Sequence, residues 1–245
     1  MRSVVLIPAR YGSSRYPGKP LVNLLGKPMV LWVAELSAKA VGKENVYVAT
    51  ESQNIVEVVE AAGFNAVMTT DDALTGTDRL AQAAEKIDAD VYINVQGDEA
   101  LVDPVDILKI RDAKLENMNE VINGFSWVSE EEDPNNVNIP KVITTEDNKL
   151  VYMSRVALPG FKIKAHAPER YKKQVCIYAF TREELVSFRT FGRKSELENS
   201  EDIEILRFLE MNKTVRLVET KPGSLAVDVP EDVVKVEAAL RNQNQ

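Results

Sequence analysis

The first half of the chain alternates short apolar runs with amphipathic segments. Apolar runs cover residues 3–8, 45–50, 65–69 and 89–96, and helical periodicity covers residues 28–40, 52–62, 77–87 and 104–115. Strands that alternate with helices of this length are joined by right-handed crossovers, which place the strands in a parallel sheet with helices on both faces. We therefore expect an α/β fold for this half.

The pattern changes near residue 120. Four runs with strand character follow with little helix between them, at residues 120–128, 140–145, 149–154 and 173–180. Without intervening helices, these strands are expected to be antiparallel and to extend or flank the main sheet. Helical periodicity returns at residues 182–188, 200–211 and 230–240.

Charge and composition narrow the class of function. The 245-residue chain has a net charge of −8 and a sequence pI near 5.0, which argues against a nucleic-acid or anionic-membrane partner. Its single cysteine excludes an intramolecular disulfide. The N-terminal apolar run of about five residues is too short for a signal peptide or a membrane span, so we expect a cytoplasmic protein.

The segment IPARYGSSRYPGKPL at residues 7–21 overlaps the end of the first apolar run and forms a loop. It carries Arg10, Arg15 and Lys19, and no Asp or Glu precedes Glu35. Glycines in the same segment let backbone amides approach an anion closely. In an otherwise acidic chain, this local charge favours a cradle for a polyphosphate over an incidental basic surface loop.

Two common phosphate-binding patterns do not fit this loop. In G-x-x-x-x-G-K-[ST], four residues separate the glycines, whereas five separate Gly12 from Gly18 here, and Pro20 stands where a hydroxyl would contact magnesium. The dinucleotide pattern G-x-G-x-x-G does not match either. A P-loop ATPase or GTPase is therefore disfavoured.

Carboxylates follow two predicted strands, at the edge where parallel α/β sheets bind ligands. Asp98 and Glu99 come after the strand at 89–96, and Asp228 follows a short run at 224–227, just before the helix expected at 230–240. Mg²⁺ prefers one or two carboxylates together with phosphate oxygens, so these residues are candidate metal ligands. The structural alternatives are a turn for Asp98 and a helix N-terminus for Asp228.

The segment TGTDRLAQAAE at residues 75–85 begins a predicted helix with Thr77 as N-cap. A polar helix start can bind phosphate or a base through its amides. His166, the single histidine, lies in a basic stretch at residues 160–173 that we expect to be an exposed loop, so it is not assigned as a general base. Cys176 lies in an apolar strand and is expected to be a small buried side chain.

Nine segments occur in the order expected for one family. They are IPARYGSSRYPGKPL, GKPM, VAT, TGTDRLA, NVQGDE, MSRVALP, IYAF, LENSEDIEILR and VDVPEDV. Through these segments nearly the whole chain resembles the 3-deoxy-manno-octulosonate cytidylyltransferases (CMP-Kdo synthetases). The resemblance implies transfer of CMP from CTP to the anomeric hydroxyl of an acidic octulose, with release of pyrophosphate, in lipopolysaccharide biosynthesis.

The same resemblance implies a fold and an assembly. We expect one nucleotidyltransferase domain over residues 1–245, with a three-layer α/β fold, a mostly parallel sheet and an antiparallel extension. Residues 1–120 would bind the nucleotide, and residues 120–228 would bind the sugar and form a homodimer. Mg²⁺ is the implied cofactor. No covalent enzyme intermediate is needed, because positioning and electrostatics suffice for this transfer.

Site residues follow from the motifs of the resemblance. Arg10 and Lys19 would contact the CTP phosphates, with Arg15 in support, and Asp98 and Asp228 would hold Mg²⁺. The implied catalytic residues are thus Arg10, Lys19 and Asp98. The remaining substrate-binding positions are Ala9, Thr77 and Gln96 for the nucleotide, and Arg155, Gln174 and Glu204 for the sugar.

Two departures from the family pattern lie on the sugar side. Gln174 stands where the family usually has His, and Ile205 stands where it has the Gln of EQLR. A neutral Gln174 removes a possible like charge near an ammonium, and Glu204 could accept a hydrogen bond from one. This favours 8-amino-3,8-dideoxy-manno-octulosonate, which a branch of the family activates, over Kdo itself.

Two further functions remain as alternatives. CMP-sialic acid synthesis uses similar chemistry and a related N-terminal motif, but the spacing from GKP to NVQGDE and the later motifs favour the octulosonate family. A non-enzymatic nucleotide-binding regulator would not need Asp228 in addition to Asp98, so the pair of carboxylates favours an enzyme.

Overall fold

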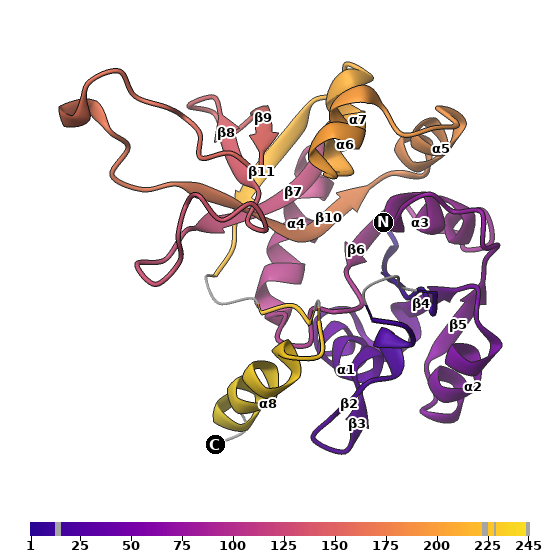
Figure 1. The fold of residues 1–245 in the computed structure, drawn as a ribbon. Helices are drawn as coiled ribbons and strands as arrows, with labels where there is room; N and C mark the ends of the chain where they lie inside the picture. The colour runs from indigo at the N-terminus through magenta and orange to yellow at the C-terminus, as the bar shows by residue number, and fades with distance from the viewer. Residues whose placement is uncertain (13–15, 222–224, 228, 244–245) are drawn as a thin grey trace.

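The computed structural model describes residues 1–12, 16–221, 225–227 and 229–243. Within these residues, a nine-stranded sheet has the order β11-β7-β10-β6-β1-β4-β5, with the hairpin of β8 and β9 attached to β10 (Figure 1). Helices pack on both faces of the sheet and enclose one large apolar cluster on each face. The three-layer α/β architecture is the one that the sequence predicts.

The parallel part of the sheet comes from the first half of the chain. β1 pairs in parallel with β4 and β6, and β4 pairs in parallel with β5. Helices α1, α2 and α4 pack on one face, and α3 packs on the other. These elements are β1 (Ser3–Pro8), α1 (Met29–Val41), β4 (Val46–Thr50), α2 (Gln53–Ala61), β5 (Asn65–Met68), α3 (Gly76–Ala84), β6 (Val91–Val95) and α4 (Pro104–Glu116).

The ends of α2 and α3 follow from local chemistry. Ser52 is the N-cap residue of α2, and the helix ends before Gly63, whose φ of +74° favours glycine. The N-cap of α3 is Thr75, whose extended backbone ends the preceding loop and whose hydroxyl accepts a hydrogen bond from Asp78 N at 3.2 Å. The prediction of Thr77 as N-cap is therefore wrong by two residues.

The second half of the chain supplies the antiparallel extension. β10 (Lys172–Phe180) runs antiparallel to both β6 and β7 (Val121–Trp127), and β8 (Lys141–Thr144) and β9 (Leu150–Ser154) form an antiparallel hairpin at its start. β11 (Val215–Glu219), which the sequence analysis did not predict, pairs in parallel with β7 at the sheet edge. Residues 225–227, expected to be strand, form none.

The helix expected over residues 200–211 is two helices, α6 (Glu196–Glu201) and α7 (Ile205–Glu210). Asp202 lies between them with φ +51°, a left-handed conformation that no helix can continue. Ser195 N donates to Glu198 Oε2 at 2.9 Å, and this contact at the helix start places the beginning of α6 earlier than expected. The resulting corner faces the C-terminal ends of β1 and β6.

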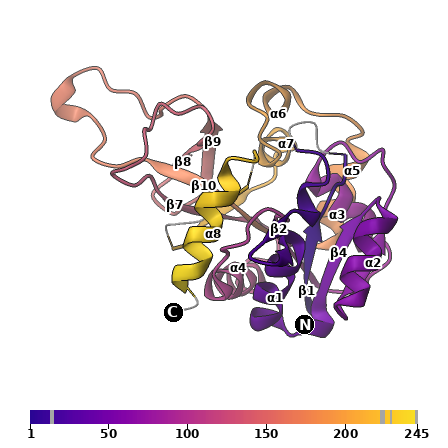
Figure 2. The same ribbon diagram turned by 60° about the horizontal axis from the view of Figure 1, so that its bottom comes forward.

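Two segments lie outside the three layers. Residues 155–171, between β9 and β10, project from the body as a long loop with one 3-10 turn, η3 (Lys164–His166) (Figures 1 and 2). Residues 160–166 are exposed as expected, but 172 and 173 belong to β10 rather than to the loop.

The C-terminal helix α8 (Asp232–Gln243) lies beside the small hairpin of β2 (Asn23–Leu24) and β3 (Lys27–Pro28) (Figures 1 and 2). Val236 and Leu240 of α8 join Leu24 in a third apolar cluster there. α5 (Arg182–Thr190) completes the helices and packs beside α3. In the described part of the chain, no helix combines the length and apolar character needed to cross a membrane.

Candidate active site

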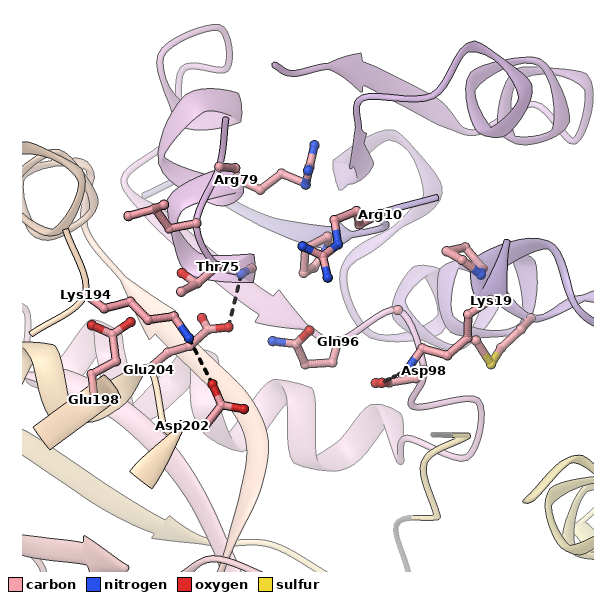
Figure 3. Close-up of a pocket in the computed structure, with 17 residues that line it drawn as sticks. Arg10, Lys19, Thr75, Arg79, Gln96, Asp98, Lys194, Glu198, Asp202 and Glu204 are labelled. Atoms are coloured by element: carbon pink, nitrogen blue, oxygen red, sulfur yellow. Dashed lines mark hydrogen bonds and ion pairs between the residues drawn. The ribbon is translucent and has the colours of Figure 1, made fainter. Parts of the chain in front are cut away.

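A cavity of about 440 Å³ opens at the C-terminal ends of β1 and β6 (Figure 3). It lies between the loop after β1, the start of α3 and the corner between α6 and α7. Figure 3 shows Arg10 and Lys19 on one side of this cavity and the carboxylates of Asp202 and Glu204 on the other. This is the edge at which open α/β sheets bind ligands.

Gly97 allows the turn after β6 to pack against the end of β1. A Cβ atom at this position would lie 2.8 Å from the Pro8 carbonyl oxygen, closer than Cβ atoms approach backbone in proteins. The absence of a side chain therefore brings Gln96 and Asp98, on either side of Gly97, into the wall of the cavity beside Arg10.

Lys19 and Asp98 form an ion pair at one end of the cavity. Lys19 Nζ lies 2.7 Å from Asp98 Oδ2, and the two side chains are 17% and 22% exposed. Gly18, with φ +71°, turns the chain into the short helix η1 (Lys19–Leu21), and its amide donates to Tyr11 O at 2.9 Å. This closed turn, which favours glycine, places the lysine of the basic loop against the carboxylate that follows β6.

The chemistry at Asp98 suits a divalent cation, because the contact with Lys19 shows that a positive charge fits against Oδ2. Mg²⁺ uses one or two carboxylates and completes its shell with phosphate oxygens and water. Among the residues that the structure describes, no group of three or more His, Cys, Asp or Glu side chains is arranged to hold a metal. A metal at Asp98 would therefore need the nucleotide or another carboxylate as well.

Two predicted site residues, Arg15 and Asp228, lie outside the described residues. Val227 is the described neighbour of the second, and its amide donates to Asp98 O at 3.4 Å. This contact places the segment that leads to α8 beside the C-terminal end of β6.

Arg79 is a cation of the cavity wall that the sequence analysis did not assign. Its guanidinium is almost fully buried, lies 2.9 Å from Glu51 Oε2 and donates to Thr69 Oγ1. Burial lowers the pKa of Arg79, and the charge of Glu51 opposes this shift. Glu51 Oε1 also accepts a hydrogen bond from Tyr11 N at 2.8 Å, so one carboxylate connects the basic loop to α3.

The amides at the start of α3, a predicted phosphate or base site, instead bind the protein's own Glu204. Gly76 N and Thr77 N donate to its carboxylate at 3.0 and 2.9 Å, and Thr77 Oγ1 donates at 2.6 Å. Burial raises the pKa of Glu204, and these hydrogen bonds oppose the rise. Glu204 lines the cavity, whereas Thr77 is fully buried behind it.

A buried ion cluster fixes the walls on either side of Glu204. Arg207 of α7 donates to Glu198 of α6 at 2.7 Å from both Nε and Nη2, and to Asp78 of α3 at 2.9 and 3.2 Å. Burial opposes the charge of Arg207, but the hydrogen bonds to the two carboxylates outweigh it and raise its pKa. All three side chains are buried, so this cluster ties three helices together at the cavity.

Two of the predicted sugar-binding residues lie outside the cavity lining of the described residues. Arg155 Nη1 donates to Val137 O at 2.8 Å and its Nη2 donates to Asp202 O at 3.0 Å, so this side chain holds the corner between α6 and α7. Gln174, on β10, donates from Nε2 to Asn123 Oδ1 at 3.2 Å and to the Tyr178 hydroxyl at 3.4 Å.

Ala9 and Cys176 are not among the described residues that line the cavity. Ala9 is buried after β1, and its amide donates to Ala49 O at 2.9 Å. Cys176 packs against the core, and burial raises the pKa of its thiol to about 12. His166 is exposed in η3, away from the cavity. The predicted site residues that surround the cavity are Arg10, Lys19, Gln96, Asp98 and Glu204.

Together, the sheet edge, the cationic loop and the facing carboxylate define an α/β protein suited to binding a nucleotide polyphosphate. Comparison with known proteins agrees with this class. The family described as cytidylyltransferase matches residues 4–215. A 3-deoxy-manno-octulosonate cytidylyltransferase of Trichlorobacter lovleyi is 39% identical over 251 residues, which cover 98% of this chain and 99% of the relative.

Two further relatives extend the comparison. An 8-amino-3,8-dideoxy-manno-octulosonate cytidylyltransferase of Shewanella baltica is 38% identical over 250 residues, covering 98% of this chain and 99% of the relative. The solved structure of a CMP:2-keto-3-deoxy-manno-octonic acid synthetase complexed with CTP superposes with a TM-score of 0.91 at 34% identity, covering 99% of this chain and 100% of that chain. The chain therefore belongs to the 3-deoxy-manno-octulosonate cytidylyltransferase family of nucleotidyltransferases.

Proposed function

We propose that this chain transfers CMP from CTP to the anomeric hydroxyl of a 3-deoxy-manno-octulosonate-type sugar acid, with release of pyrophosphate, for lipopolysaccharide biosynthesis. The observation that carries the proposal is the cavity that brings Arg10, Lys19 and Asp98 together at the ends of β1 and β6. The related structure with CTP, at a TM-score of 0.91, supports a nucleotide in the equivalent cavity.

The roles of these residues follow from the chemistry of phosphoryl transfer. Negative charge spreads over the phosphate oxygens in the transition state, and catalysis consists mainly of positioning and charge stabilisation. Arg10 and Lys19 would neutralise the triphosphate, and Arg79, tied to the loop through Glu51, would add positive charge to the same wall. Asp98, with Asp228, would hold Mg²⁺, which when bound neutralises phosphate charge and polarises the reacting phosphorus.

We propose 8-amino-3,8-dideoxy-manno-octulosonate as the acceptor. Glu204 presents a carboxylate to the cavity, and Gln174, on the sheet face that carries α3 and α7, is neutral and cannot repel an ammonium. The Tyr178 hydroxyl contacts Gln174, and the charge of Glu204 adds to the rise of the Tyr178 pKa, of which burial is the main cause. Kdo itself is the second candidate, since the Trichlorobacter lovleyi relative carries the Kdo name.

The homodimer is also a proposal. Three large apolar side chains, Val156, Phe161 and Ile163, are 65%, 51% and 53% exposed on the projecting loop 155–171. Apolar side chains gathered on one projecting segment mark an interaction surface, which supports assembly through residues 120–228. The cytoplasmic location and the lack of a nucleic-acid partner stay predictions of the sequence.

Pyrophosphate release tests the reaction. Purified protein is incubated with Mg²⁺, one of the four nucleoside triphosphates, and either octulosonate acceptor. We expect release with CTP and an acceptor, and little with CTP alone or with ATP and GTP. Hydrolysis of ATP or GTP without acceptor would instead support an NTPase, and nucleotide binding without turnover would support a regulator.

A direct competition tests the choice of acceptor. Equimolar Kdo and the 8-amino sugar are supplied with limiting CTP, and the two CMP-sugars are quantified by mass spectrometry. We expect the amino sugar to dominate, and Gln174→His, which restores the usual family residue, to move the product ratio towards Kdo. A wild-type excess of CMP-Kdo would overturn the proposed acceptor but not the reaction.

A further inference from the structure

Asn123 is a fully buried amide in the middle of β7, opposite an irregularity in the pairing of β10. Its Nδ2 lies within hydrogen-bond distance of three backbone carbonyls, Gly124 O at 3.1 Å, Val175 O at 2.8 Å and Ile177 O at 3.2 Å. Carbonyl oxygens only accept hydrogen bonds. The atom that faces them must therefore be the amide nitrogen, and the orientation of the Asn123 side chain is fixed.

This orientation determines the orientation of Gln174. Asn123 Oδ1 lies 3.2 Å from the Gln174 amide. Because Oδ1 can only accept a hydrogen bond, the Gln174 atom there must be the amide nitrogen Nε2. The same amide nitrogen lies 3.4 Å from the Tyr178 hydroxyl. Burial raises the pKa of Tyr178 well above its usual range, so this group stays a neutral phenol. Both Nε2 hydrogens of Gln174 thus point at protein groups, the Asn123 oxygen and the Tyr178 hydroxyl.

The carbonyl oxygen is consequently the atom of the Gln174 amide that is not engaged by these protein groups. Gln174 is half-buried, and no described residue donates a hydrogen bond to its Oε1. The side chains of Asn123, Gln174 and Tyr178 lie on the sheet face that carries α3 and α7, the face on which Glu204 lines the cavity. An acceptor oxygen at this place suits an ammonium or a hydroxyl and gives nothing to a methyl group.

We propose that Asn123 is a positioning residue for acceptor specificity: it locks the Gln174 amide so that the carbonyl oxygen faces the sugar and selects a hydrogen-bond donor there. The inference rests on the proposed function, because it concerns the acceptor of the same reaction. A histidine at position 174 would lack this fixed polarity, since an imidazole nitrogen can donate or accept according to its protonation state.

The test compares acceptors that differ in one group at C8: ammonium, hydroxyl, or hydrogen in the 8-deoxy sugar. A hydrogen bond to a charged group typically contributes about 1.5–3 kcal/mol, so wild type should prefer the amino sugar to the 8-deoxy sugar about 10- to 100-fold in kcat/KM. Asn123→Ala frees the Gln174 amide to rotate and should reduce this preference at least about fivefold, with the KM for CTP unchanged.

Two variants bracket that result. Gln174→Met keeps the length of the side chain and removes the oxygen, and should reduce the preference at least as much as Asn123→Ala does, leaving only the part that Glu204 contributes. Ser126→Ala removes a buried hydroxyl of the same strand that has no hydrogen-bond partner among the described residues, and should change nothing. If Asn123→Ala keeps its wild-type preference at a wild-type melting temperature, or if Gln174→Met keeps it, the proposal is wrong.

A measurement on the wild-type protein separates this inference from the proposed reaction. The NMR signal of the ¹⁵N-labelled Gln174 side-chain NH₂ group is assigned by its loss in Gln174→Met. Its hydrogens should exchange with solvent at least about tenfold more slowly than those of unstructured glutamine. Unprotected hydrogens would show a rotating amide and overturn the inference even if CMP transfer proceeds. Protected hydrogens without any CMP transfer would overturn the proposed function and leave the orientation of Gln174 established.

Discussion

Arg207→Met is the substitution expected to damage this fold most clearly. Arg207 is fully buried, donates four hydrogen bonds to the carboxylates of Asp78 and Glu198, and stacks on Phe188 with its guanidinium 3.7 Å from the ring centre. Methionine fills part of the volume but leaves two buried carboxylates without a cation. Breaking a buried pair in this way costs about 3–5 kcal/mol, so we expect that loss in the free energy of unfolding.

Urea unfolding of the wild type and three variants measures the effect. Arg207→Lys should lose less than Arg207→Met, because an ammonium keeps the charge but cannot fork between two carboxylates. Arg189→Met removes a comparable cation from an exposed pair with Glu85 and should cost less than about 1 kcal/mol. If Arg207→Met is as stable as Arg189→Met, the claim that this ion cluster holds α3, α6 and α7 around the cavity is refuted.

Three further substitutions probe the cavity. Lys19→Met removes the cation that is paired with Asp98. Without an ammonium that competes for this carboxylate, worth about 1–2 kcal/mol, Mn²⁺ should bind the nucleotide-free protein about 5- to 30-fold more tightly, and CTP should bind more weakly. Unchanged or weaker Mn²⁺ binding in calorimetry would contradict this. Gly97→Ala places a Cβ 2.8 Å from Pro8 O, so it should lower the free energy of unfolding by about 1–3 kcal/mol and slow pyrophosphate release. Gly160→Ala, at a position with open space around it, should change neither quantity. Burial raises the pKa of Glu204 above its usual 4.5, so the unfolded chain ionises first as pH rises. The wild type should therefore lose stability relative to Glu204→Gln as pH rises above about 4.5, and a constant difference in urea midpoints would refute the raised pKa.

Local patterns in the sequence predicted the layers of the fold. The alternation of apolar runs and helical periodicity gave the parallel strands β1, β4, β5 and β6 in their observed places, because each element is specified by its own residues. Strands without intervening helices likewise identified the antiparallel extension. The strand β11 was missed because its five residues, VRLVE, mix charged and apolar side chains at a sheet edge.

Tertiary contacts decided what local patterns could not. Residues 200–211 have continuous helical periodicity, yet the helix is broken at Asp202. Beyond the break, Arg207 makes a buried contact with Asp78, which is 129 residues away in sequence, and local periodicity cannot predict such a contact. The α3 amides were expected to bind phosphate or a base, but Glu204, 127 residues from Thr77, binds them.

The site was predictable to the extent that it lies in the loops after strands. Arg10, Lys19, Gln96 and Asp98 meet at one cavity because the carboxyl ends of parallel strands share an edge. Arg79 was not predictable in this way, since its place in the cavity wall depends on its contact with Glu51, which follows a different strand. The roles of Asn123 and Gln174 likewise depend on pairing between distant strands.

The central claim is that the cavity with Lys19 and Asp98 transfers CMP to a sugar acid, and ³¹P NMR of the reaction tests it most directly. With CTP, Mg²⁺ and the 8-amino sugar or Kdo, the account predicts equal growth of a phosphodiester signal and of pyrophosphate. Asp98→Asn should abolish both signals while its melting temperature stays near that of the wild type, and Asp112→Asn, on the exposed surface of α4, should leave them intact. Pyrophosphate without a phosphodiester, or an unaffected rate in Asp98→Asn, would contradict the account.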